Sequence, residues 1–192
     1  MAPLYRETDL GGRLTPFKGI WPKVDDSAFI LHGAQVVGDV VIGPGSSIWH
    51  NTVVRGDVHH VRIGARSNVQ DGTVVHVTTH KNPTLIGDDV LVAHKAMLHG
   101  CTLEDGAFVG MGAIVMDRAV VEGGGMLAAG GMLTPGKVIR RGELWAGSPA
   151  SLMRTLSDAE IAANMRMPEH YRLLAEQHRL DARGEQAIHP YP

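Results

Sequence analysis

The fold is decided by a periodic run that begins ILHGAQ-VVGDVV-IGPGSS-IWHNTV-V at residues 30–54, in which an aliphatic residue opens each group of six. The period slips by three residues after Val54, is interrupted for longer after Val75 and then continues to Trp145. Eighteen of the nineteen opening positions are Ile, Leu or Val: Ile30, Val36, Ile42, Ile48, Val54, Ile63, Val69, Val75, Ile86, Val92, Leu98, Leu103, Val109, Val115, Val121, Leu127, Leu133 and Ile139, with Trp145 closing the series. Six residues are too few for a helix and its turn, but they fit one short strand and a corner, with the aliphatic side chain facing inward.

Glycine and small residues recur at fixed places in this pattern. The second residue of a group is often glycine, as at Gly43 and Gly110, and the fifth is usually small or β-branched, as at Ser46 and Ala113. The chain contains 24 glycines and only 5% aromatic residues, which favours regular turns over an ordinary globular core. Because three units close one triangular coil, the nineteen units predict an all-β solenoid, a parallel β-helix of about six coils.

The repeat separates a solenoid from two flanking parts. Ser157 and Glu160 have the spacing of a helix capping box, and apolar residues at helical spacing follow them. We therefore expect a C-terminal α-helix, which Pro168 should break or restart because proline has no backbone N–H. The predicted parts are an extended N-terminal lead-in at residues 1–28, the β-helix domain at 29–150, the helical segment at 151–182 and a loose tail at 183–192.

Composition argues against several classes of partner. The 18 basic and 20 acidic residues give a net charge of -2, so neither nucleic acid nor an anionic membrane is an expected partner. The first thirty residues hold no apolar segment of signal-peptide or transmembrane length. Cys101 is the single cysteine and cannot form an internal disulfide, which fits a reducing compartment. We therefore expect a cytoplasmic protein.

Three histidines, His76, His94 and His99, lie in the stretch Val75–Gly100. His76 and His99 each follow the inward residue of the same face of the coil, so we expect them on neighbouring rungs, about 4.8 Å apart. His94 lies two places after the inward residue of a different face. Imidazole is a usual ligand of zinc, and three imidazoles leave a fourth coordination position for water or substrate.

Prism geometry directs His94 away from the other two histidines within one chain. A threefold arrangement of prisms would bring the His94 column of one protomer against the column of His76 and His99 on the next. We therefore predict a homotrimer in which each metal site takes His76 and His99 from one chain and His94 from its neighbour.

Further residues around the histidines carry a family resemblance. In order and spacing, the chain resembles the γ-class carbonic anhydrases at Arg55-Gly56-Asp57, Gln70-Asp71, His76, His94 and His99. The run His94–Cys101 and the later Val109–Gly112 are similar to the small bacterial YrdA-like branch of that family. The resemblance implies a left-handed coil and a metal-dependent lyase with one metal ion at each subunit interface of a homotrimer. Zn²⁺ is the implied metal, with Fe²⁺ or Co²⁺ as alternatives, and the implied reaction is reversible hydration of carbon dioxide to bicarbonate by a metal-bound hydroxide.

The resemblance also implies roles for residues beside the ligands. Arg55 and Asp71 would pair across the subunit boundary, Asp57 would lie near the metal column, and Gln70 would hydrogen-bond the metal-bound water or bicarbonate. Tyr171 matches a tyrosine that related proteins place over the site from the C-terminal helix. The alternative for Arg55, Asp57 and Asp71 is an intersubunit salt-bridge network with no catalytic task, and for Tyr171 it is packing alone.

Two departures from the γ-class pattern concern proton removal. Val58 stands where the archetype has a glutamate, and residues 77–85 contain no carboxylate, although the archetype places a proton-transfer glutamate in this loop. Fast turnover needs a titrating side chain near the site, so hydration is expected to be weak or absent. His80 is the candidate substitute, with a surface histidine of no function as the alternative. His59 and His60 are expected in a loop.

Two other functions compete with carbonic anhydrase activity. One is a hexapeptide-repeat acyltransferase that uses coenzyme A, in which a single histidine would act as general base without metal. The other is a non-catalytic trimeric scaffold stabilised by its metal. Metal analysis distinguishes the acyltransferase from the carbonic anhydrase, and a hydration assay distinguishes the non-catalytic scaffold from it.

Overall fold

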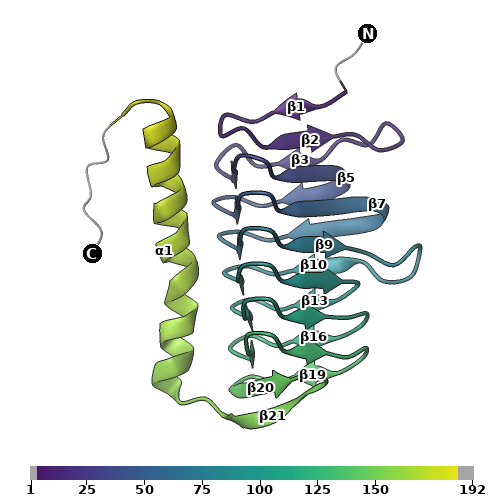
Figure 1. Cartoon of the computed structure of the whole chain (residues 1–192), viewed down its shortest axis with the longest axis vertical. Helices are drawn as coiled ribbons and strands as arrows, with labels where there is room; N and C mark the ends of the chain where they lie inside the picture. Colours follow the sequence, from purple (N-terminus) through teal and green to yellow (C-terminus); the bar gives the residue numbers. More distant parts are fainter. Residues whose placement is uncertain (1–3, 186–192) are drawn as a thin grey trace.

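The inward-facing aliphatic residues organise the structure, a computed structural model that describes residues 4–185. It is a left-handed parallel β-helix of about seven turns with one C-terminal helix running along its side (Figure 1), which confirms the predicted fold class. All eighteen aliphatic opening positions are buried, and Trp145 is partly buried against the same core. The sequence predicted about six coils because it left the lead-in out of the count. Leu14 and Val24 of that segment also pack against the core, and their strands add the first turn.

Each turn contributes short strands to three faces of the prism, and β1 (Arg6–Glu7) adds one strand antiparallel to β2. The first face holds β2 (Arg13–Thr15), the start of β5 (Gln35–Ile42), the start of β7 (Val53–Ile63), β9 (Val74–His76), β12 (Met97–His99), β15 (Ile114–Val115) and β18 (Met132–Leu133). The second face holds β4 (Phe29–Ile30), β6 (Ser47–Ile48), β8 (Asn68–Val69), β11 (Leu91–Val92), β14 (Phe108–Val109), β17 (Met126–Leu127), β20 (Glu143–Gly147) and the antiparallel β21 (Ala150–Thr155). The third face holds β3 (Lys23–Val24), the ends of β5 and β7, β10 (Thr84–Ile86), β13 (Thr102–Leu103), β16 (Val120–Val121) and β19 (Val138–Ile139).

The strand register aligns the repeat as the sequence predicted. On the first face Val75 pairs with Leu98, and His76 pairs with His99 on the next rung. On the second face Val69 pairs with Val92. These pairings fix which outward side chains form columns and so determine where the polar residues of the site lie.

Left-handed corners explain nine of the 24 glycines. At almost every corner the fourth residue of the group has a positive φ, for example 71° at Gly136, a conformation that glycine adopts without steric cost. The second-position glycines have a different cause. A Cβ at Gly110 would lie 2.5 Å from the backbone nitrogen of Ala129 on the next rung, so the close stacking of rungs excludes a side chain there.

β5 and β7 continue around a corner from the first face to the third, so the repeat slips without forming a loop. The expectation that His59 and His60 lie in a loop is therefore wrong, because both belong to β7. Their rings make an edge contact with centroids 4.6 Å apart. β7 pairs with β5 as far as Gly56 and again from Val61, so the inserted residues form a register shift within one continuous strand.

The C-terminal helix α1 spans Asp158–Ala182 and packs against β6 and β8 on the second face. Its capping box is present, since the Ser157 side chain accepts from the Glu160 backbone N–H and the Glu160 side chain accepts from the Ser157 N–H. The predicted break at Pro168 is wrong, because the helix continues through this buried residue. Proline removes only one helical hydrogen bond, and its ring packs on the covered side of α1. Within residues 4–185, no helix combines the length and hydropathy needed to cross a membrane.

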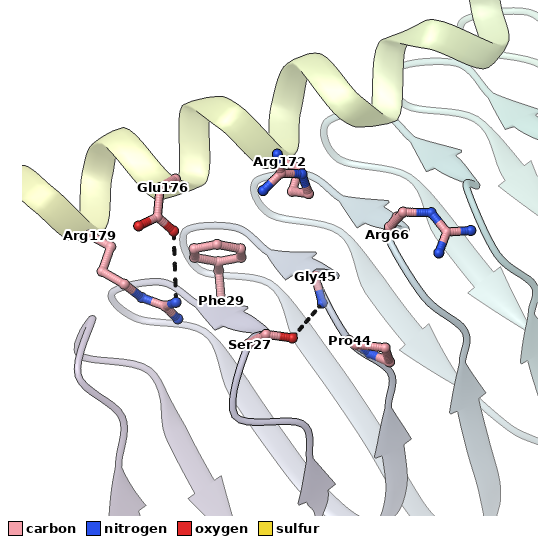
Figure 2. A pocket seen from close by; sticks show the side chains of 8 residues that line it. All are labelled: Ser27, Phe29, Pro44, Gly45, Arg66, Arg172, Glu176 and Arg179. Atoms are coloured by element: carbon pink, nitrogen blue, oxygen red, sulfur yellow. Dashed lines mark hydrogen bonds and ion pairs between the residues drawn. The ribbon is translucent and has the colours of Figure 1, made fainter. Parts of the chain in front are cut away.

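Paired arginines line a hollow of about 370 Å³ between α1 and the solenoid (Figure 2). Arg179 stacks over the Phe29 ring at 4.0 Å and lies 3.1 Å from Asp9. Arg66 and Arg172, which also line the hollow, bind Asp89 and Glu169 respectively. Each of these guanidinium groups thus has an acidic partner, and the hollow contains none of the predicted site residues. We interpret it as part of the attachment of α1. Of the predicted tail at residues 183–192, residues 186–192 lie outside the described residues.

Candidate metal centre

His76 and His99 lie side by side at the corner between the first and third faces. His76 ends β9 and His99 ends β12, and the two residues are register partners on adjacent rungs. Their rings tilt toward each other, so that Nδ1 of His76 lies 3.3 Å from Nε2 of His99. The repeat thus brings together two imidazoles that are separated by 22 residues in sequence.

A carboxylate holds the far side of each ring. Asp57 Oδ1 lies 3.0 Å from Nε2 of His76, and Asp117 Oδ1 lies 2.7 Å from Nδ1 of His99. Burial acts to raise the pKa of both carboxyl groups, but their hydrogen bonds outweigh it, and each pKa is lowered below the usual aspartate value. An ionised carboxylate only accepts hydrogen bonds, so each ring N–H donates to its aspartate.

The remaining ring nitrogens have the geometry of a metal pair. With one ring N–H directed at each of Asp57 and Asp117, Nδ1 of His76 and Nε2 of His99 face each other at hydrogen-bond distance, a place that either a shared ring proton or a metal cation can occupy. Two nitrogens bound at 2.0–2.1 Å to a tetrahedral ion lie about 3.3–3.4 Å apart. The observed 3.3 Å separation therefore fits zinc or a similar divalent metal. A histidine that binds zinc usually donates its other ring N–H to a carboxylate or a carbonyl, as both of these rings do.

His94 occupies the other edge of the first face, at the corner that leads from Val92 on the second face to Leu98. Its Nδ1 lies 2.9 Å from Oδ2 of Asp71, which leaves Nε2 as the free ring nitrogen. Within residues 4–185 of one chain, no three His, Cys, Asp or Glu side chains converge as a metal site. His94 is thus oriented by a carboxylate as the other two histidines are, but from a separate edge.

Gln70 is a buried side chain whose amide oxygen is hydrogen-bonded and whose amide nitrogen is not. It is only 1% exposed, and its Oε1 accepts a 3.2 Å hydrogen bond from the backbone N–H of His94. Its Nε2 is buried without a hydrogen-bond partner. On the same strand side, buried Asn68 donates to Ser47 and has an unpartnered Oδ1. Buried polar atoms without partners are costly, so these two amides mark a place where a ligand or another chain belongs.

Arg55 and the two predicted aspartates each have a partner within one chain. Within one chain Arg55 binds Asp57, and Asp71 binds His94. Asp57 thus links Arg55 to His76. The predicted pairing of Arg55 with Asp71 involves a neighbouring chain and stays a prediction.

The last two predicted residues lie farther from the histidine pair. Tyr171 of α1 packs edge-on against Trp49 at a centroid distance of 5.8 Å. Trp49 holds on its rung the position that Gln70 holds on the next, so Tyr171 covers the column that leads to Gln70. His80 is exposed in the loop that follows His76, and its backbone N–H donates to the carbonyl of Val58.

Asp117 and Asn68 are site residues that sequence reasoning missed. Asp117 follows the inward residue Val115 by two places, so the repeat places it at the same corner as His99, one rung farther on. Its position was therefore available in the sequence. Its contact with His99 was not, because that depends on a side-chain orientation that the repeat does not specify.

Known proteins similar to this chain fall in two groups by name. Residues 22–56 match the family model described as bacterial transferase hexapeptide (six repeats). Over 162 residues the chain is 48% identical to gamma carbonic anhydrase 2, mitochondrial, of Arabidopsis thaliana, covering 82% of this chain and 58% of that protein. It is 48% identical to protein YrdA of Escherichia coli, covering 78% and 84% of the two chains, and 43% identical to a carbonic anhydrase of Geobacillus kaustophilus, covering 81% and 85%.

The chain spans less than two thirds of the length of the plant relatives. Among solved structures, a hexapeptide transferase family protein from Anaplasma phagocytophilum is 49% identical, with a TM-score of 0.82 over 85% of this chain and 96% of that one. The similarity therefore covers both the repeat and the residues of the candidate centre.

Proposed function

The chain belongs to the γ-class carbonic anhydrase family of hexapeptide-repeat proteins, in the YrdA-like branch, and on that premise we propose that it reversibly hydrates carbon dioxide to bicarbonate at a metal site shared between subunits of a homotrimer. The observation that carries the proposal is the 3.3 Å approach of His76 Nδ1 and His99 Nε2, each ring being held by a carboxylate. Zn²⁺ is the proposed metal, with Fe²⁺ or Co²⁺ as alternatives.

The positions of the histidines on the prism support a shared site. His94 lies at one edge of the first face, whereas His76 and His99 lie at the other edge. If three first faces surround a threefold axis, each vertex of the resulting triangle joins the His94 edge of one protomer to the His76 edge of the next. His94 Nε2 from one chain then completes a three-nitrogen site with His76 and His99 from its neighbour.

The outward column of the first face supports the same arrangement. From the rung of Val53 to that of Met132, the outward column between its two histidine edges is apolar, and it begins after Gln35 on the preceding rung: Val53, Val74, Met97, Ile114 and Met132. Met97 and Ile114 are 39% and 37% exposed in the single chain. An apolar strip of this kind is stabilised by association with a like surface. The second face is already covered by α1.

Each site residue has a task in the proposed reaction. A metal bound by the three histidines supplies a Lewis acid that lowers the pKa of water and so provides a nucleophile at neutral pH. Asp57, Asp71 and Asp117 orient the imidazoles and fix which ring nitrogen carries the proton. Gln70 Nε2 donates to a substrate oxygen, while Arg55 pairs with Asp71 of the adjoining chain. Tyr171 covers the site and helps to exclude water.

Proton transfer to solvent is assigned to His80. Its loop meets Val58, where the family archetype has a glutamate, through the hydrogen bond from His80 N to Val58 O. An imidazole titrates in the useful pH range, but an exposed one on a loop is less well placed than a fixed carboxylate. We therefore expect slower turnover than in relatives with an acidic loop. The buried single cysteine accords with a reducing compartment, and we propose a cytoplasmic location.

The function is tested by metal quantification together with stopped-flow hydration of carbon dioxide. About one metal per chain and hydration that rises with pH between about 6 and 9 are expected. The shared site is tested by mixing His76→Ala and His94→Ala chains, each inactive alone. Random assembly should restore about one quarter of the sites, because one interface in four joins an intact pair to an intact His94. Mixed trimers without metal would contradict the shared site.

The competing function is acyl transfer from coenzyme A. It is favoured by the transferase family model at residues 22–56 and by the transferase name of the Anaplasma structure. Transfer needs one histidine base, and it leaves the carboxylate-backed pair unexplained. Coenzyme A binding measured by calorimetry decides between the two, since the carbonic anhydrase should not bind it. Metal content without hydration or coenzyme A binding would favour the trimeric scaffold.

A further inference from the structure

Asp117 makes three side-chain hydrogen bonds that join separate parts of the centre. Its Oδ1 accepts from the His99 ring at 2.7 Å. Its Oδ2 accepts from the Thr78 hydroxyl at 2.6 Å and from the Asn82 amide at 3.2 Å. One carboxylate thus contacts both a proposed ligand and the two ends of the loop that carries His80.

The backbone makes room for this carboxylate at Gly100. A Cβ added to Gly100 would lie 2.5 Å from Asp117 Oδ1 and 2.9 Å from the Asn82 Cβ. These distances are shorter than any normal contact, so a side chain at Gly100 would displace Asp117 or the loop. Gly100 also has a φ of 57°, which favours glycine independently.

Corner aspartates elsewhere in the solenoid have a different task. Asp88 Oδ1 accepts from the backbone N–H of Ala65 at 2.7 Å, and Asp105 Oδ1 accepts from the N–H of Asp88 at 2.8 Å. Both carboxylates tie one rung to the next through the main chain. Asp117 occupies a comparable corner, but its carboxylate accepts hydrogen bonds from side chains of the centre and its loop.

We propose that Asp117 is a positioning residue that fixes the ring of His99 with Nε2 directed at His76 and, through its second oxygen, fastens loop 77–83 to the same ligand. The proposal rests on the proposed function for the identity of His99 as a ligand. It adds a mechanical link between that ligand and the loop of the proposed proton acceptor.

Neighbouring contacts close the link into a ring. The loop is bridged by the hydrogen bond from Thr78 N to Asn82 O. Thr84, where the loop ends, donates to the carbonyl of His76 at 2.5 Å and accepts from the N–H of Gly100 at 2.9 Å. The loop therefore begins and ends on the two histidine rungs, with Asp117 as the side chain that connects its interior to them.

The variant Asp117→Asn tests the link because an amide has one acceptor oxygen and one donor nitrogen. It cannot accept from His99 on one side and from Thr78 and Asn82 on the other. We expect zinc affinity, measured by chelator competition, to fall about 10- to 100-fold. In metal-free protein we expect faster amide exchange in residues 77–83 and a shift of His99 toward the Nε2–H tautomer in ¹⁵N spectra.

Two further variants separate positioning from general stability. Asp105→Asn changes a corner aspartate that has no contact with the centre, and it should leave zinc affinity and loop exchange unchanged. Thr78→Val removes only the loop hydroxyl, so it should speed exchange in the loop while zinc affinity falls less than about threefold.

Unchanged zinc affinity and unchanged His99 tautomer in Asp117→Asn would overturn the proposal, as would equal effects from Asp105→Asn. If the wild-type protein bound no zinc, the proposed function would fail by itself. The exchange and tautomer measurements on metal-free protein would still decide whether Asp117 holds His99 and the loop together.

Discussion

Gln70 illustrates how one side chain can be held for a partner that the single chain lacks. Its oxygen is fixed by the His94 N–H, which leaves the buried Nε2 as an oriented but unpaired donor. A donor kept in this state costs stability, so its retention is better explained by substrate or by an adjoining subunit than by folding of the chain.

The variant Gln70→Met separates these roles. We expect hydration to fall about 100-fold while metal content is retained, because the lost group is the proposed donor to the reacting oxygen and is not one of the proposed metal ligands. The melting temperature should change by no more than about 3 °C, since losing an acceptor for His94 N–H is offset by removing an unpaired donor. Stopped-flow rates per bound metal decide the matter. Parallel loss of metal and activity would contradict the orienting role.

Acid should weaken the hydrogen bonds by which aspartates orient His76 and His99 within one chain. Asp57 and Asp117 have a folded-state pKa below the ordinary value of 3.8, so they stabilise the fold fully above that value. This contribution is lost as the pH falls through the lowered folded-state pKa. The melting temperature of metal-free wild-type protein should therefore exceed that of Asp117→Asn at neutral pH, and the difference should shrink by about pH 3. A difference that is constant with pH would show that the carboxylate charge has no stabilising role.

How much of the site could be predicted depends on how each residue is fixed. His76 and His99 share a column because the backbone register sets it, and register follows from the aliphatic repeat. Asp117 could not be assigned, because its partners Thr78 and Asn82 lie in an excursion outside the repeat. The pairing of Asp71 with His94 was also missed, since it depends on side-chain direction at a corner.

At the level of the element, glycine is favoured at two positions of each group for different reasons: the left-handed backbone at the corner and the close stacking of rungs. The sequence drew attention to the second position of each group, where stacked backbones leave no space. The fourth position, with its left-handed backbone, was not recognised, because Asn51, Arg66, Asp89, Lys95 and Arg118 occupy it at some corners. Because other residues also adopt the left-handed backbone at some corners, the preference for glycine at the fourth position is hard to recognise in the sequence.

Two substitutions measure these demands. Gly136→Ala meets no atom within 4 Å but keeps a φ of 71°, so it should lower the unfolding free energy by about 1 kcal/mol through backbone strain alone. Gly110→Ala must push apart two rungs and should cost about 3 kcal/mol. Denaturant titration by circular dichroism measures both, with exposed Lys137→Ala as the neutral control. Equal costs for the two glycines would contradict the distinction.

The helix shows which local signals are sufficient. The capping box was predictable because Ser157 and Glu160 satisfy each other within one turn. The continuation through Pro168 was not, because it depends on burial of the proline ring against the solenoid. The lead-in is similar, since the strands at residues 13–24 form by pairing with β5 and carry no repeat of their own.

At the scale of the whole molecule, the three faces have unequal surroundings. The second face is covered by α1, and the first face carries an apolar column between two edges that each hold part of the proposed metal site. The third face bears the exposed Val138 but no ligand edge pair. This inequality favours one orientation of protomers about a threefold axis, with the first face inward.

The variant Ile114→Lys tests that orientation. It places three ammonium groups at the proposed axis, where burial without partners is unfavourable, so light scattering should show the single-chain mass of 20.6 kDa. Metal content should be lost with the trimer, because His94 no longer meets His76 and His99. Circular dichroism should still report a folded solenoid, since the inward neighbour Val115 is unchanged. Val138→Lys, at a third-face position that is 38% exposed, is the matched control and should remain trimeric with its metal. A metal-loaded trimer of Ile114→Lys would show that the first face does not line the axis.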